Sequence, residues 1–98
     1  MKLPVRYQRA AINEYLDAAN WLERQRPGSA AAFLQAVDAT IDRIRSEPRR
    51  YPIESKDNRL APIPDYSYVI YYRIETDRIR VISVFHTSRD PAIWQSRV

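Results

Sequence analysis

The sequence contains no cysteine and only one glycine and one histidine among its 98 residues. Without cysteine there can be no disulfide, no thiolate zinc site and no cysteine nucleophile. A single glycine, Gly28, cannot build the glycine-rich loops that bind phosphates in Rossmann or P-loop proteins. Because His86 is the only imidazole, a multi-histidine metal site is also excluded. We therefore expect no metal ion and no organic cofactor.

Long hydrophobic runs are missing as well. No stretch approaches the ~20 consecutive apolar residues that cross a bilayer, and residues 1–6 turn polar too early for a secretory signal peptide. We therefore expect a cytoplasmic protein that does not bind membranes. The composition, with 45% hydrophobic and 29% charged residues, is typical of a soluble globular protein. The length predicts one domain that spans residues 1–98.

The charge balance is positive and is carried almost entirely by arginine. Sixteen basic residues face twelve acidic ones, and only Lys2 and Lys56 among the basic residues are lysines. The planar guanidinium suits phosphate and carboxylate groups, so the composition points to nucleic acid or an acidic protein segment as a partner. An arginine-rich proteome encoded by a GC-rich genome would explain the same excess without any partner.

Two segments have the apolar spacing of amphipathic helices. The first begins after Gln8 and should end at residues 26–29, where proline and glycine interrupt the pattern. The second should begin with Ser29 as its N-cap and end before Pro48. The short connection predicts an antiparallel helical hairpin. The expected apolar stripes are Ile12, Tyr15, Leu16, Ala19 and Leu22, then Phe33, Ala36, Val37, Thr40, Ile41 and Ile44.

The remaining segments favour strands. Residues 66–74 and 78–86 are rich in aromatic and β-branched residues, and so few residues join them that they should form a hairpin. Residues 1–7 alternate like a short edge strand, and residues 59–63 are compatible with another. The tail from residue 87 has no run long enough for a full helix. The predicted fold is therefore α+β, in the order β-α-α-β-β-β, with the helical hairpin packed on an antiparallel β-sheet.

The hairpin register can be predicted if Thr76 and Asp77 form the turn. Arg73 then faces Arg80, and like charges so placed repel each other. An anionic ligand or partner would relieve the repulsion; alternatively, the register slips by one residue or both guanidiniums turn into water. The face expected against the helices carries Tyr68, Ile70, Tyr72, Ile74, Ile79, Val81, Ser83 and Phe85. The face expected to be open carries Ser67, Val69, Tyr71, Arg73, Arg80, Ile82, Val84 and His86.

The element order, the size and several strings together resemble the RelE/ParE toxin superfamily of type II toxin–antitoxin modules. The strings are residues 32–44, EPRRYP at 47–52, Arg59, YVIYYRI at 68–74 and VFHTSRDP at 84–91, followed by Trp94 and Arg97. This resemblance implies a small toxin that a cognate antitoxin neutralises. Antitoxins of this kind wrap a flexible segment around the helices and sheet of the toxin and fold as they bind.

The superfamily contains two activities. RelE-like members cut messenger RNA in the ribosomal A site, whereas ParE-like members bind DNA gyrase and block supercoiling. Residues 86–91 look more like the ParE type, so the resemblance favours a gyrase inhibitor that acts by binding. A ribosome-dependent endoribonuclease is the alternative. A basic nucleic-acid-binding module without toxicity is a third hypothesis.

Metal-free RNA cleavage needs proton transfer as well as cations for the phosphorane. Arginine supplies only positive charge, because its pKa of roughly 12.5 or more keeps it protonated. The proton-transfer group could be His86, a carboxylate such as Glu54 or Glu75, or a perturbed tyrosine or lysine. As a nuclease site we consider His86 with Arg59, Arg73 and Arg89. RelE-like nucleases often carry a tyrosine near the C-terminus, and this chain has none after Tyr72. We therefore favour no catalytic residue.

The candidate target- or partner-binding residues are aromatic or cationic, and several also have a structural interpretation. His86 could instead hydrogen-bond the tail and hold it on the sheet. Trp94 could pack the tail onto the core, and Trp21 could be a half-buried flank of the first helix. The full set is Trp21, Arg59, Tyr71, Arg73, Arg80, His86, Arg89, Trp94 and Arg97.

Overall fold

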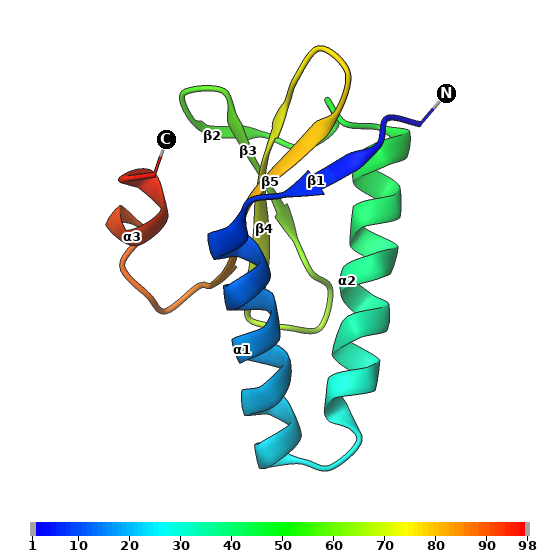
Figure 1. Ribbon diagram of the computed structural model, residues 1–98, viewed down its shortest axis with the longest axis vertical. Coiled ribbons are helices and arrows are strands. Elements are labelled where there is room, and N and C mark those ends of the chain that lie inside the picture. The colour runs from blue at the N-terminus through cyan, green and yellow to red at the C-terminus, as the bar shows by residue number, and fades with distance from the viewer. Residues whose placement is uncertain (1, 98) are drawn as a thin grey trace.

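The computed structural model describes residues 2–97 and confirms the α+β fold: a helical hairpin lies against one face of a sheet (Figure 1). A short third helix lies on the other side of the sheet from the hairpin. The elements are β1 (Val5–Tyr7), α1 (Arg9–Gln25), α2 (Ser29–Ser46), β2 (Ile53–Ser55), β3 (Asn58–Pro62), β4 (Tyr68–Ile74), β5 (Ile79–His86) and α3 (Ala92–Gln95).

Within residues 2–97 the sheet has five strands, in the order β1-β5-β4-β3-β2. The prediction of an antiparallel sheet is correct for β2 to β5 and wrong for β1, which runs parallel to β5. The local pattern could not predict this direction, because β1 and β5 are far apart in the sequence and no tight turn fixes their orientation. The β2 strand was also not predicted.

A β-bulge divides the β4–β5 hairpin into two registers. Near the turn the predicted pairs form, with Arg73 opposite Arg80, but the register shifts between Tyr71 and Tyr72. Because β5 has one extra residue at the bulge, each residue after it points to the opposite face of the sheet from the one that strict alternation predicts. Val84 therefore packs in the core beneath the helices and Phe85 packs on the opposite face, which is the reverse of the prediction.

The main core lies between the hairpin and the sheet. The predicted α2 stripe is confirmed, with Phe33 fully buried and in edge-to-face contact with the rings of Tyr15, Tyr66 and Tyr68. The α1 stripe is partly wrong, because Ile12 is 43% exposed and Leu16 is 54% exposed. The buried residues of α1 are small instead, which lets the helix approach the sheet closely: Ala11, Ala18 and Ala19.

The turn between the helices uses a cap that sequence reasoning missed. Ser29 is not the N-cap, since its hydroxyl donates to the carbonyl oxygen of Leu22 at 2.6 Å. The N-cap is Gly28, whose φ of 90° lies in the left-handed region that favours glycine. The Glu23 carboxylate accepts hydrogen bonds from the N–H groups of Gly28 and Ala30 at 3.0 and 3.1 Å. These bonds hold the pKa of Glu23 below its usual value.

The face of the sheet away from the hairpin is not open as predicted. The Trp94 side chain of α3 is 1% exposed and stacks on the Tyr71 ring, with 3.9 Å between the ring centroids. The two rings belong to a second buried cluster with Val69, Ile82 and Phe85. The chain after β5 therefore turns back and covers this end of the sheet with α3 (Figure 1).

Candidate binding groove

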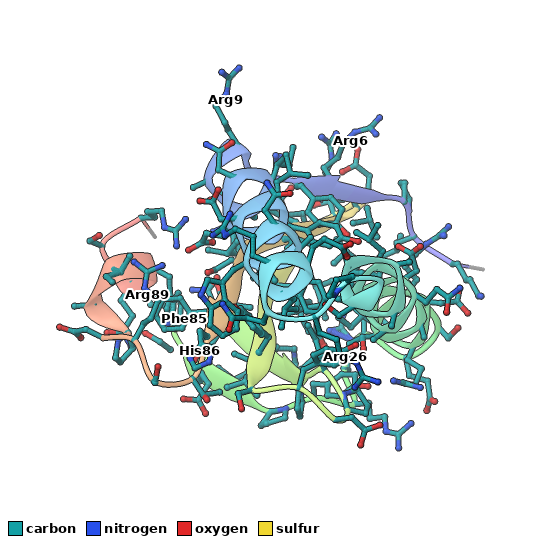
Figure 2. All side chains as sticks on the ribbon, turned by 90° about the horizontal axis from the view of Figure 1, so that it is seen from below. Arg6, Arg9, Arg26, Phe85, His86 and Arg89 are labelled. Carbon is teal, nitrogen blue, oxygen red and sulfur yellow. The ribbon has the colours of Figure 1, made fainter. Side chains whose placement is uncertain are left out.

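A hollow with a volume of about 340 Å³ runs between α1 and the end of β5. We call it the α1–β5 groove. Figure 2 shows Phe85, His86 and Arg89 gathered on the side of the molecule that α3 occupies. The groove continues into a shallower hollow that Ser88 also lines. Its lining residues are Glu14, Asp17, Ala18, Asn20, Trp21, Arg24, Tyr68, Val84, His86 and Arg89.

The groove exists because β1 is short. It pairs only with Ile79–Val81, so within residues 2–97 the outer edge of β5 beyond Val81 has no strand partner. Helix α1 crosses this edge instead. The Glu14 carboxylate accepts a hydrogen bond from the Val84 N–H at 3.3 Å and another from the Ser83 hydroxyl at 2.8 Å. One helix side chain thus replaces the missing strand.

The same carboxylate anchors the tail. Arg97 Nη2 lies 3.1 Å from Glu14 Oε2 and 3.3 Å from the Ser83 hydroxyl oxygen. Both charged side chains are mostly buried, 22% and 14% exposed for Arg97 and Glu14. The structure therefore places Arg97 in a structural ion pair. Sequence reasoning missed Glu14, because in the sequence it is simply an acidic residue beside Tyr15 of the apolar stripe, and its partners lie far away along the chain.

His86 holds the turn that follows β5. Its Nδ1 atom accepts a hydrogen bond from the Ser88 N–H at 3.1 Å and lies 2.7 Å from the Ser88 hydroxyl oxygen. The imidazole also makes an edge-to-face contact with the Tyr68 ring, at 4.9 Å between centroids. The bulge has moved this residue to the groove, away from the Tyr71, Arg73 and Arg80 face on which it was predicted.

The rim of the groove combines an exposed aromatic ring with cations. Trp21 on α1 is 46% exposed, and Arg24 lies one turn further along the same helix. Arg89 reaches the opposite rim, where its guanidinium lies 5.8 Å from the centroid of the Phe85 ring. An exposed tryptophan beside arginines is typical of the residues that anchor protein partners. The arrangement can therefore bind a protein segment that offers apolar and acidic side chains.

The residues predicted for a nuclease site are not brought together. Arg59 pairs with Tyr72 across the sheet and donates hydrogen bonds to the carbonyl oxygens of Arg49 and Tyr51 at 3.2 and 2.7 Å. Arg73 is five residues along β4 from the Tyr68 that pairs with His86, which is about 17 Å of strand. Of the three candidate cations, only Arg89 shares the groove with His86.

Arg73 and Arg80 face each other as predicted, and the chain itself relieves their repulsion. Glu75 lies between them, with Oε2 3.1 Å from Arg73 Nη2 and Oε1 3.3 Å from Arg80 Nη2. The register does not shift at this pair, and Glu75 supplies a negative charge from within the chain. The hydrogen bond from Arg73, with a further one from Arg80, holds the pKa of the Glu75 carboxyl below its usual value.

This cluster predicts a pH-dependent contribution to stability. The folded-state pKa of Glu75 is lowered, so its ionised form stabilises the folded protein. This stabilisation is fully present above the unfolded-state pKa of about 4.3 and is lost as the pH falls through the folded-state pKa. We expect the wild type to have a higher Tm than the Glu75→Gln variant near neutral pH. The difference should shrink in acid. Thermal unfolding of both proteins at about pH 7 and about pH 3 measures it, and an unchanged difference would contradict this account.

Two other features of residues 2–97 bear on the kind of site. No cluster of three or more histidine or acidic side chains lies close enough together to hold a metal ion. No helix in this range is both long and apolar enough to cross a membrane.

Comparison with known proteins identifies the family. A family model described as the ParE toxin of the type II toxin–antitoxin system parDE matches residues 5–91. No curated protein matches the chain. A solved structure from a chromosomal ParDE toxin–antitoxin system of P. aeruginosa has the same fold, with a TM-score of 0.76 at 11% sequence identity, covering 87% of this chain and 96% of that one. Since the family model covers nearly the whole described chain, this protein belongs to the ParE toxin family of type II toxin–antitoxin systems.

Proposed function

We propose that this protein is the toxin of a type II toxin–antitoxin module, that it inhibits DNA gyrase in the cytoplasm by binding it, and that a cognate antitoxin neutralises it. The family match supports the toxin assignment. The observation that carries the choice of target is the separation of His86 from Arg59 and Arg73. ParE-like members act on gyrase without cleaving RNA.

An RNase would need a proton acceptor, a proton donor and cations around one phosphate. Here the Nδ1 atom of His86 is engaged by the Ser88 N–H, and Arg59 is engaged by two backbone carbonyl oxygens. Arg73 is engaged by Glu75 at the far end of β4. These contacts favour structural roles for the residues that a nuclease would use, and leave binding as the better supported activity.

The α1–β5 groove is the surface that we assign to a protein partner. Trp21 supplies an apolar anchor, and Arg24 and Arg89 supply positive charge on the two sides of it. Both the antitoxin and the target are proteins, so two separate measurements are needed to distinguish which of them occupies the groove.

The His86→Ala variant separates binding from cleavage. We expect induced expression of this variant to arrest growth at a toxin level within a few-fold of the wild type, because the imidazole serves the turn and not a chemical step. Growth arrest should be measured together with mapping of messenger RNA ends and with affinity for the antitoxin.

Loss of growth arrest with unchanged antitoxin affinity, together with codon-phased RNA ends produced by the wild type alone, would establish the ribosome-dependent nuclease instead. If neither protein arrests growth but both bind nucleic acid, the chain is the non-toxic binding module.

A further inference from the structure

The sheet carries a row of three arginines on adjacent strands. Arg6 of β1 pairs with Arg80 of β5, and Arg80 pairs with Arg73 of β4. Residues paired side by side point to the same face of a sheet. Their neighbours along the strands, including Val5, Ile79 and Ile74, pack into the core beneath the helices. The three arginines therefore project from the opposite face. We call them the arginine row.

The row has more positive charge than the chain neutralises. Glu75 binds both Arg73 and Arg80, whose side chains are still 33% and 29% exposed. Within residues 2–97 no carboxylate pairs with Arg6, and Figure 2 shows this side chain projecting outward from β1. The other acidic residue nearby, Asp77, pairs with Arg78. Glu75 thus serves two cations of the row and also Arg78, which lies 3.9 Å from it, while Arg6 has no carboxylate partner within residues 2–97.

We propose that the arginine row binds the phosphate backbone of nucleic acid, independently of base sequence. Neighbouring strands are about 4.8 Å apart, so the backbone positions of the three arginines span about 10 Å across the sheet. Evenly spaced phosphates match such a row, and arginine binds phosphate through two parallel hydrogen bonds. This contact adds to the proposed binding of gyrase and does not depend on it.

A protein partner fits the arginine row less well than it fits the α1–β5 groove. Binding hot spots need an apolar anchor in addition to charge. None of the exposed large hydrophobic side chains in residues 2–97 lies on β1, β4 or β5. On the same face of β4, two residues before Arg73, the Tyr71 ring is 7% exposed and packs against Trp94, which is 1% exposed. The row offers charge alone, which suits a polyanion.

Fluorescence anisotropy with a short labelled DNA duplex tests the proposal without gyrase or antitoxin. We expect the affinity of the wild type to fall steeply between about 50 and 200 mM salt. Arg6→Gln should weaken binding by about threefold to tenfold and reduce the magnitude of the log–log salt slope by about 1. Glu75→Gln should tighten binding by about threefold, because it removes the carboxylate that pairs with Arg73 and Arg80. Arg26→Gln, an equal charge change at the helix turn, should change the affinity by less than about twofold.

Three results would overturn the proposal. One is no detectable binding by the wild type at about 50 mM salt. Another is an equal loss for Arg6→Gln and Arg26→Gln, which would mean attraction by overall charge. The third is tight binding of a poly-glutamate peptide that needs Arg6 while DNA binding does not, which would assign the row to an acidic protein segment. Circular dichroism melts of each variant distinguish a variant that has misfolded from one that has only lost its contact with DNA. Since the probe is naked DNA, any of these results leaves gyrase inhibition untouched.

Discussion

Replacing Trp94 by alanine is expected to lower the free energy of unfolding by about 3–5 kcal/mol. The indole is 1% exposed, stacks on Tyr71 at 3.9 Å and is the only part of α3 that is buried. Without it, the apolar face formed by Val69, Ile82 and Phe85 loses its cover. Urea unfolding followed by far-UV circular dichroism measures the change through the midpoint and the m-value.

The neighbouring Ile93 provides a matched control. This side chain is 41% exposed on the same short helix, so Ile93→Ala should change stability by no more than about 0.5 kcal/mol. If Trp94→Ala also proves nearly neutral in stability but loses toxicity, the packing account is wrong. Trp94 would then be a residue that contacts the target.

The second large effect is expected at the α1–β5 groove. Reversing the charge of Arg89 should weaken inhibition of gyrase by tenfold or more, on the order expected when an acidic partner meets a like charge. Arg89 is exposed and its guanidinium rests on Phe85, so Arg89→Glu changes the rim of the groove without opening the core. Titration of the variant against a fixed amount of gyrase gives the inhibitory concentration.

Arg26→Glu makes the same charge change at the turn between the helices, away from the groove, and should leave inhibition within about twofold. Affinity for the antitoxin should be measured on the same proteins. If Arg89→Glu keeps full inhibition and loses only antitoxin binding, the groove belongs to the antitoxin and the target binds elsewhere.

Much of the fold could be predicted from local patterns. The spacing of Phe33, Val37 and Ile44 gave the buried face of α2, and the three-residue link at 75–77 gave the hairpin and the pairing of Arg73 with Arg80. Both depend on contacts between residues close in sequence. The family resemblance was confirmed by the match over residues 5–91.

The position of His86 could not be predicted, because it depends on one extra residue in β5. The bulge lies inside a run made mostly of β-branched and aromatic residues, where nothing in the sequence marks the extra residue. Its consequence is large, since it moves His86 from the face of Arg73 and Arg80 to the groove beside α1. The nuclease hypothesis depended on the unbulged register.

Long-range partners were equally hidden. Glu14 binds Ser83, Val84 and Arg97, at sequence separations of up to 83 residues. Glu75 neutralises two arginines through side-chain geometry that strand alternation alone does not give. At Arg73 and Arg80 the Glu75 carboxylate lies where the sequence allowed an external anion, and the Glu14 carboxylate pairs with Arg97, which was a candidate for partner binding.

The measurement that tests the central claim most directly is a supercoiling assay of DNA gyrase with purified, antitoxin-free protein. We predict that the wild type and His86→Ala both inhibit supercoiling, that cleaved DNA accumulates, and that added antitoxin restores activity. Full gyrase activity at a large excess of toxin would contradict the proposed function, and would return His86 and Arg89 to consideration as parts of a ribosome-dependent nuclease.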